Sequence, residues 1–335
     1  MGPPIGDPSR SPIRAHQGSV AALAFSPDGK TLATVGGDET DPTIRLWDPG
    51  TRETIAEPIR HPGGATSVAF SPHAQLFATG GYAGTVRFWD PDSGTPVRPP
   101  VKHPGGVMSM AFSPDGRILA SAGFEGSIRL WNVATGGQIG DPLQRGTGGI
   151  ARSVAFSPNG RLLASSDDVG AHLWDPESGE RIGSPMRHPD GASAVAFSPD
   201  GRIIASGGSD GSIRLWDPTT TEPVGMPLSG HARPVTSLTF SSDGRLLVSG
   251  GQDGTIRLWD PAAGDPVGGP LAAHKYGVAA VAMSPGSNLL ASAGGDGTVR
   301  LWDWDSDHAC EVADSYVASS QLDPYVPSGW QLSCR

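Results

Sequence analysis

The stretch SDGSIRLWDP, residues 209–218, is nearly repeated as QDGTIRLWDP from Gln252 and as GDGTVRLWDW from Gly295. A tryptophan followed by Asp, or in one copy by Asn, ends this phrase seven times, and successive tryptophans are 42 or 43 residues apart. These tryptophans are Trp47, Trp89, Trp131, Trp174, Trp216, Trp259 and Trp302. A fixed period of this length predicts a repeat architecture in which each unit packs against its neighbours.

Each repeat is expected to form four short strands. In the fifth copy, an apolar-small alternation ends in the turn signal Pro-Asp-Gly at 199–201 and continues as RIIASGG, residues 202–208. The Asp-Gly pair at 210–211 then leads into SIRLWD, which predicts a tight hairpin turn. A final segment, PVGMPL in this copy, carries a proline at the same place in every repeat. Because proline cannot donate to a strand ladder, this segment is expected at an outer edge.

Composition narrows the classes of function. The chain has 335 residues and a formal net charge of −10, with no basic run, which argues against a nucleic-acid or anionic-membrane surface. No stretch approaches the roughly 18 apolar residues of a membrane span, and the first residues lack the apolar core of a secretory signal. Only Cys310 and Cys334 could form a disulfide, so a cytoplasmic protein is expected.

With this repeat, the chain resembles the WD-repeat family of β-propellers, in the form found in bacterial signalling proteins with a short C-terminal extension. The resemblance covers residues 12–303. It implies an all-β, seven-bladed propeller of four-stranded antiparallel blades, closed by an N-terminal strand at about residues 8–15. We therefore expect a propeller domain over 1–303 and an extension over 304–335.

The resemblance also implies a hydrogen-bonded set of His, Ser or Thr, Asp and Trp inside each blade. A buried indole N–H requires an acceptor, and a hydroxyl that accepts this bond can donate to imidazole. Complete sets are expected in copies one, five, six and seven: His16, Thr34, Asp38 and Trp47; His188, Ser206, Asp210 and Trp216; His231, Ser249, Asp253 and Trp259; His274, Ser292, Asp296 and Trp302. Copies two to four depart from the pattern at Ala83, Glu125 and Thr147, so their blades are expected to be held less firmly.

The recurring His and Arg residues favour structural roles. One His per blade places neighbouring imidazoles in different blades, whereas a metal site needs three or four ligands around one ion. No motif for a nucleophile, a paired-carboxylate site or a phosphate loop stands apart from the repeat. We expect no catalytic residues, metal or cofactor. An arginine two residues before the tryptophan recurs in six copies and is expected to cover apolar surface with its stem.

In the family, partners commonly bind the face that carries the His-containing connectors and the Asp-Gly turns. On the matching positions, large side chains gather in copies two to four: Tyr82, Met108, Phe124, Ile150 and Arg152. Exposed aromatic, Met and Arg side chains are enriched in interfaces. The alternative is that Tyr82 and Phe124 fill space left by the incomplete sets beside them.

The sequence as a whole favours a monomeric, non-catalytic scaffold for protein partners, acting as the sensor or docking end of a signalling protein. Two alternatives remain. One is a regulatory segment of a larger protein kinase or ATPase, and the other is a propeller enzyme or glycan-binding protein that uses the central channel.

Overall fold

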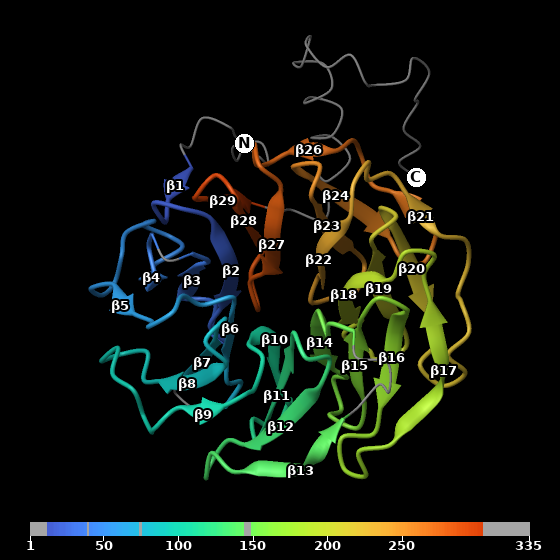
Figure 1. Ribbon diagram of the computed structural model, residues 1–335. Helices are drawn as coiled ribbons and strands as arrows, with labels where there is room; N and C mark the ends of the chain where they lie inside the picture. The colour runs from blue at the N-terminus through green and yellow to red at the C-terminus, as the bar shows by residue number, and fades with distance from the viewer. Residues whose placement is uncertain (1–11, 39, 74–75, 144–148, 304–335) are drawn as a thin grey trace.

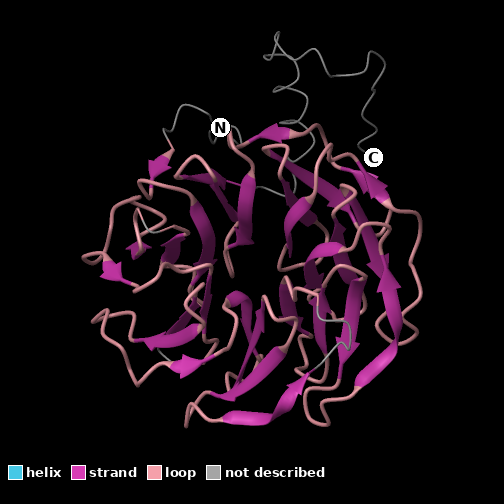
Figure 2. Ribbon diagram, in the orientation of Figure 1, coloured by secondary structure: helices cyan, strands magenta, loops and turns pink. Residues whose placement is uncertain are grey.

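The computed structural model describes residues 12–38, 40–73, 76–143 and 149–303. These residues form seven antiparallel sheets arranged as blades around a central axis (Figure 1), and every regular element among them is a strand (Figure 2). The predicted seven-bladed propeller is thus confirmed. None of the described residues belongs to a helix long and apolar enough to cross a membrane. The expected extension, 304–335, lies outside the described residues.

The innermost strand of each blade lies nearest the axis, and blades are numbered in chain order by this strand (Figure 1). In these strands larger apolar residues alternate with Ala, Ser and Thr, which leaves room where seven strands converge. The inner strands are β2 (Val20–Phe25), β6 (Ser67–Phe70), β10 (Val107–Phe112), β14 (Ser153–Phe156), β18 (Ala192–Phe197), β22 (Val235–Phe240) and β27 (Val278–Met283).

The second and third strands of each blade form its buried middle. The second strands are β3 (Leu32–Gly36), β7 (Phe77–Gly80), β11 (Ile118–Gly123), β15 (Leu163–Ser166), β19 (Ile204–Gly208), β23 (Leu247–Gly251) and β28 (Leu289–Gly294). The third strands are β4 (Thr43–Trp47), β8 (Thr85–Trp89), β12 (Ile128–Asn132), β16 (Gly170–Trp174), β20 (Ser212–Trp216), β24 (Thr255–Asp260) and β29 (Thr298–Asp303).

Outer strands differ between blades. Most are short pieces that begin just after the repeated proline: β5 (Ile59–Arg60), β9 (Val101–Lys102), β21 (Leu228–Ser229), and β26 (Leu271–Ala272), which accompanies β25 (Asp265–Pro266). Blades three and four instead have the continuous strands β13 (Gln138–Leu143) and β17 (Arg181–Arg187). There the proline lies inside the strand, and the pairing register shifts beside it. Such a shift lets the strand continue past a residue that cannot donate a hydrogen bond.

An N-terminal strand closes the ring. β1 (Ile13–Arg14) pairs with β29, with Ile13 opposite Val299 and Arg14 opposite Thr298. It therefore supplies the outer strand of blade seven, as expected. The backbone N–H groups of Ala15 and His16 extend this junction by donating to the carbonyl of Gly297.

The hydrophobic core lies between the blades. Each repeated tryptophan packs against side chains of the preceding blade; Trp216, for example, joins Leu173 and Met186 of blade four, and Trp47 joins Ala291 and Val299 of blade seven. All seven indoles are buried. Removing a Trp side chain of this kind costs about 3–5 kcal/mol, so each indole stabilises the contact between two blades.

Candidate functional site: hydrogen-bonded sets and the connector face

Blades six and seven contain complete hydrogen-bonded sets. In blade six, Trp259 Nε1 donates to Ser249 Oγ over 2.9 Å, and this hydroxyl lies 2.8 Å from His231 Nε2. The other ring nitrogen, His231 Nδ1, lies 3.0 Å from Asp253 Oδ2. Blade seven repeats the geometry, with His274 Nδ1 3.0 Å from Asp296 Oδ1. A set in which a carboxylate oxygen lies within 3.3 Å of His Nδ1 is called closed below.

The bonding order fixes the proton positions. The serine oxygen accepts the indole N–H, so the serine O–H is free to donate to His Nε2. The proton on the imidazole is then on Nδ1, and this N–H donates to the carboxylate. Burial alone would raise the pKa of Asp253, but the bonds from His231 and Thr255 hold that pKa well below its ordinary value. Burial lowers the pKa of His274, and Asp296 offsets part of this change. The set in blade seven therefore holds a neutral imidazole beside an ionised carboxylate.

Blade one is closed through a different aspartate from the one expected. His16 Nδ1 lies 3.3 Å from Asp41 Oδ2, not beside Asp38. Asp38 instead accepts the backbone N–H groups of Ser19 and Thr40. The turn of this copy is longer, and the acid that keeps the spacing of six residues before the tryptophan is Asp41, as Asp253 does before Trp259. Counting back from Trp47 would have identified it.

Blade five holds the expected residues but is open. Trp216 Nε1 and His188 Nε2 both reach Ser206 Oγ at 2.7 Å. However, His188 Nδ1 lies 3.9 Å from Asp210 Oδ1, which exceeds hydrogen-bonding distance. The expectation of a complete set in this blade is therefore corrected. Burial lowers the pKa of His188 to about 4.

Blades two and three are open, and both have a His in the expected connector. In blade two, no described side chain is hydrogen-bonded to either ring nitrogen of His61. In blade three, His103 Nδ1 contacts Ser121 Oγ at 2.8 Å, while Glu125 bonds Ser127 and Arg129 instead of the imidazole. Burial lowers the pKa of both histidines to about 4.

The residue that follows the histidine separates closed from open sets. In blades one, six and seven it is Gln17, Ala232 or Lys275, and its backbone N–H donates to the same carboxylate that faces the imidazole. In blades two, three and five it is a proline: Pro62, Pro104 or Pro189. Proline has no N–H to offer. One main-chain donor thus accompanies every closed set and is missing from every open one.

Blade four uses a different pair. Thr147, the residue expected in place of a histidine, lies outside the described residues. Trp174 Nε1 donates to Ser165 Oγ over 2.9 Å. His172, in the place of the repeated arginine, puts Nε2 2.7 Å from Asp167 Oδ2, and both side chains are buried. Asp167 also accepts the N–H groups of Val169 and Gly170, which fixes its shortened turn.

Two of the predicted partner-binding residues meet on the connector face. The rings of Tyr82 and Phe124 stack with their centroids 5.7 Å apart, although they come from neighbouring blades. Tyr82 is 57% exposed, whereas Phe124 is half-buried over the connector at Gly106. Gly106 has φ +87°, and a Cβ there would lie 3.0 Å from the Phe124 ring, so glycine permits this close approach.

The other three predicted residues belong to blades three and four. Arg152 Nη2 donates to Asp168 Oδ1 over 2.5 Å, and both side chains remain partly exposed. Met108 is half-buried in β10, and Ile150 is half-buried just before β14. The structure joins Tyr82 to Phe124 and Arg152 to Asp168.

Sequence reasoning missed one exposed aromatic residue. Tyr276 in the blade-seven connector is 68% exposed, and the Lys275 ammonium lies 5.2 Å from its ring centroid. It lies two residues after His274, outside the positions considered for partner contacts. An aromatic residue where the other connectors carry Gly, Asp or Arg was the available signal.

The repeated arginines and the acidic groups serve local structure. Arg45 lies 3.4 Å from Asp41, and Arg129 lies 3.0 Å from Glu125. Within the described ranges, no group of three or more His, Cys, Asp or Glu side chains is placed to hold a metal ion.

Comparison with known proteins identifies the repeat. The family model described as WD domain, G-beta repeat matches residues 6–48, 53–90, 94–132, 140–175, 179–217, 222–260 and 266–303. Parts of the chain resemble the uncharacterized WD repeat-containing protein sll1491 of Synechocystis (40% identity over 65 residues), telomerase protein component 1 of Mus musculus (39% over 74) and the periodic tryptophan protein 2 homolog of Schizosaccharomyces pombe (37% over 60).

These similarities cover 19%, 22% and 18% of this chain and 18%, 3% and 7% of the respective relatives. Each similarity therefore extends over the length of one to two repeats. The family model, by contrast, matches seven consecutive segments, each of which carries the inner three strands of one blade and outer-strand residues of the blade before it. The chain belongs to the WD-repeat family of β-propellers.

Proposed function

We propose that this propeller is a non-catalytic scaffold that binds a protein partner through the connector face of blades two to four. WD-repeat domains generally bind protein partners. The observation that carries the proposal is the Tyr82–Phe124 stack, because it presents a large aromatic surface to solvent at a boundary between blades. Stacked aromatic side chains with few rotatable bonds lose little entropy on binding, which suits an anchor.

The space-filling alternative predicts a different environment. A ring that only filled a gap beside an incomplete set would be covered, but more than half of Tyr82 is exposed. The Tyr82 ring instead stacks on Phe124 of the next blade. The Phe124 ring packs closely over the backbone at Gly106, and its other face stacks with the exposed Tyr82 ring.

The channel alternative has less support. Several inner-strand hydroxyls are used to join blades: Ser109 Oγ accepts the N–H of Val154, Ser153 Oγ that of Val195, and Ser237 Oγ that of Val281. These hydroxyls therefore have a structural role between neighbouring blades. We therefore favour a monomeric interaction module in the cytoplasm, at the docking end of a signalling protein.

Capture by crosslinking in the native lysate tests the proposal. Replacing Tyr82 and Phe124 together by Ala is expected to abolish capture of the proteins that the unmodified domain retains, without changing its melting temperature by more than a few degrees. Tyr276→Ala is the matched control, since it removes an equally exposed tyrosine from the same face in blade seven. Unchanged capture by the double variant would contradict the proposal.

A further inference from the structure

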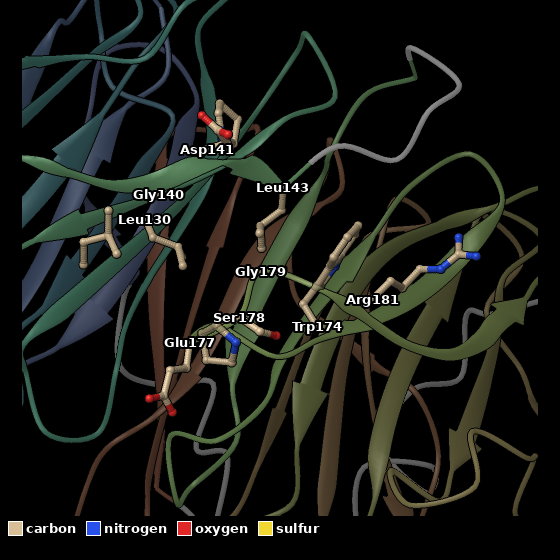
Figure 3. Close-up of a pocket in the computed structure, with 12 residues that line it drawn as sticks. Leu130, Gly140, Asp141, Leu143, Trp174, Glu177, Ser178, Gly179 and Arg181 are labelled. Atoms are coloured by element: carbon tan, nitrogen blue, oxygen red, sulfur yellow. The ribbon is translucent and has the colours of Figure 1, made fainter.

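A hollow of about 620 Å³ lies on the outer rim between blades three and four (Figure 3). Its apolar floor is formed by Leu130 of β12, Leu143 of β13 and Trp174 of β16, which face one space from three strands. The volume lies in the range of ligand sites, and the mixture of apolar floor and polar rim is typical of them.

The rim of this hollow is acidic. The carboxylates of Asp141 and Glu177 lie at opposite ends of the group of side chains, and both residues are exposed (Figure 3). The Arg181 guanidinium points away from the floor (Figure 3). It is therefore poorly placed to neutralise either carboxylate across the hollow.

A second hollow of about 480 Å³ continues the first. The two share Pro176 and Glu177, and the second is bounded on its other sides by the turns at Asp115 and Arg161. Together their ionisable lining residues are four acids (Asp115, Asp141, Asp175 and Glu177) and two arginines (Arg161 and Arg181), a formal balance of −2. The combined shape is elongated, and its charge is complementary to a cationic ligand.

The hydrogen-bonding groups on the outer edge of β13 bear on how a partner segment could bind in these hollows. Gln138 Nε2 donates to the carbonyl of Gly140 over 2.8 Å, and Pro142 supplies no N–H, so an added strand would find few free main-chain partners. Gly140 has φ +61°, and no described atom lies within 4 Å of the position that a Cβ would occupy. An incoming chain therefore has room to pass close to the backbone at Gly140, and the few free main-chain partners on β13 favour side-chain insertion over strand addition.

We propose that this rim groove, the two hollows joined at Pro176 and Glu177, binds an extended basic segment of a partner protein. One aliphatic side chain of the segment fills the space over Leu143 and Trp174. Arginine or lysine side chains on either side of it reach Asp141 and Glu177. The groove is on a different surface from the Tyr82–Phe124 stack, and its occupancy does not depend on the connector face.

A labelled synthetic peptide, Gly-Gly-Arg-Arg-Leu-Arg-Arg-Gly-Gly, is the probe, measured by fluorescence anisotropy at physiological salt. Glu177→Lys is expected to weaken binding about tenfold, as is replacing the peptide leucine by serine. The matched control is Asp92→Lys, which makes the same change in net charge at the equivalent turn position of blade two. Both residues are exposed, and both donate a backbone N–H to the preceding turn aspartate.

Binding that changes by no more than about twofold with Asp92→Lys and Tyr82→Ala, but weakens about tenfold with Glu177→Lys, supports the groove. Asp141→Lys, on the other wall, should reproduce the loss. Equal weakening by Glu177→Lys and Asp92→Lys would show general charge attraction and would overturn the proposal. So would equal or tighter binding of the same peptide with Glu in place of each Arg, or no binding to the unmodified domain.

Discussion

Blades six and two show how far one repeat can vary inside an unchanged fold. Both contain a buried histidine and a buried tryptophan, but His231 has side-chain hydrogen-bonding partners at both ring nitrogens, whereas no described side chain bonds a ring nitrogen of His61. The indoles and the packing between blades are common to both. Burial of the tryptophans is therefore enough to form a blade, and the closed set adds local stability on top of it.

The main-chain donor after the histidine explains the difference. In a closed set the carboxylate accepts two N–H groups from one connector, the imidazole and the following amide. Hydrogen bonds to a charged group contribute about 1.5–3 kcal/mol each, so the pair draws the turn against the connector. With a proline after the histidine, the second donor is gone, and in blade five the aspartate remains 3.9 Å from the ring.

The largest expected effect that separates the two kinds of blade is on acid stability. His61, His103 and His188, all in His-Pro blades, have a folded-state pKa near 4 instead of 6.5, so the unfolded chain binds more protons below pH 6.5. Stability contributed by each histidine is thus complete above pH 6.5 and is lost as the pH falls towards 4. By pH 5 the loss is about 2 kcal/mol for each.

Chemical denaturation between pH 7 and 5 measures this loss. His61→Leu removes one of these three histidines, so the average slope of unfolding free energy against pH over this range should become shallower by about 1 kcal/mol per pH unit. A slope identical to that of the unmodified protein would contradict the assignment of a buried neutral imidazole to blade two.

Removing the aspartate should be more damaging in blade six than in blade five. Asp253→Ala leaves the donors of His231 and Ala232 without their acceptor and should cost about 1–3 kcal/mol. Asp210→Ala breaks no bond to His188 and should cost less than about 1 kcal/mol. Thermal unfolding of the two variants side by side gives the ranking, and equal losses would count against the distinction between closed and open sets.

Exchanging the residue after the histidine should convert one kind of blade into the other. Ala232→Pro removes the amide donor to Asp253, which lowers the free energy of unfolding. Proline also lowers the conformational entropy of the unfolded chain, which offsets part of this loss, so the expected net destabilisation is about 1–2 kcal/mol. Proline at the equivalent place in three other blades shows that the connector path tolerates it. A melting temperature that did not change would mean that the amide bond is incidental.

The smallest effect is expected from restoring the missing acid in blade two. Ala83→Asp alone should add less than about 0.5 kcal/mol, because Pro62 provides no second donor. Combined with Pro62→Ala it should add about 1 kcal/mol, as one new bond to a charged group would. The interaction between the two substitutions in a double-mutant cycle is the quantity to measure, and strict additivity would argue against cooperation.

Much of the fold was predictable from the tryptophan period and the turn signals, because these follow from local chemistry. The closing strand at Ile13–Arg14 followed from the same pattern. The bonding inside the blades was harder to predict. His188 and His231 belong to sets of identical residue types, yet their Nδ1–carboxylate distances are 3.9 and 3.0 Å. The residue after each histidine, Pro189 or Ala232, accompanies this difference of less than 1 Å, but its effect is visible only once the two loops are placed together.

Other features could be predicted only in part. The stack of Tyr82 and Phe124 joins positions that were singled out one by one, but their contact across two blades depends on the glycine at 106. The longer outer strands of blades three and four have the same proline as their shorter counterparts. The two hollows between these blades are lined by residues of both repeats, and no sequence motif marks them.

The most direct test is a crystal structure of the Pro189→Ala variant beside that of the unmodified protein. If the amide after the histidine closes the set, residue 189 will donate to Asp210, and the distance from His188 Nδ1 to the carboxylate will shorten from 3.9 Å to about 3 Å. A variant in which the new amide is present and Asp210 stays beyond hydrogen-bonding distance of His188 would contradict the account.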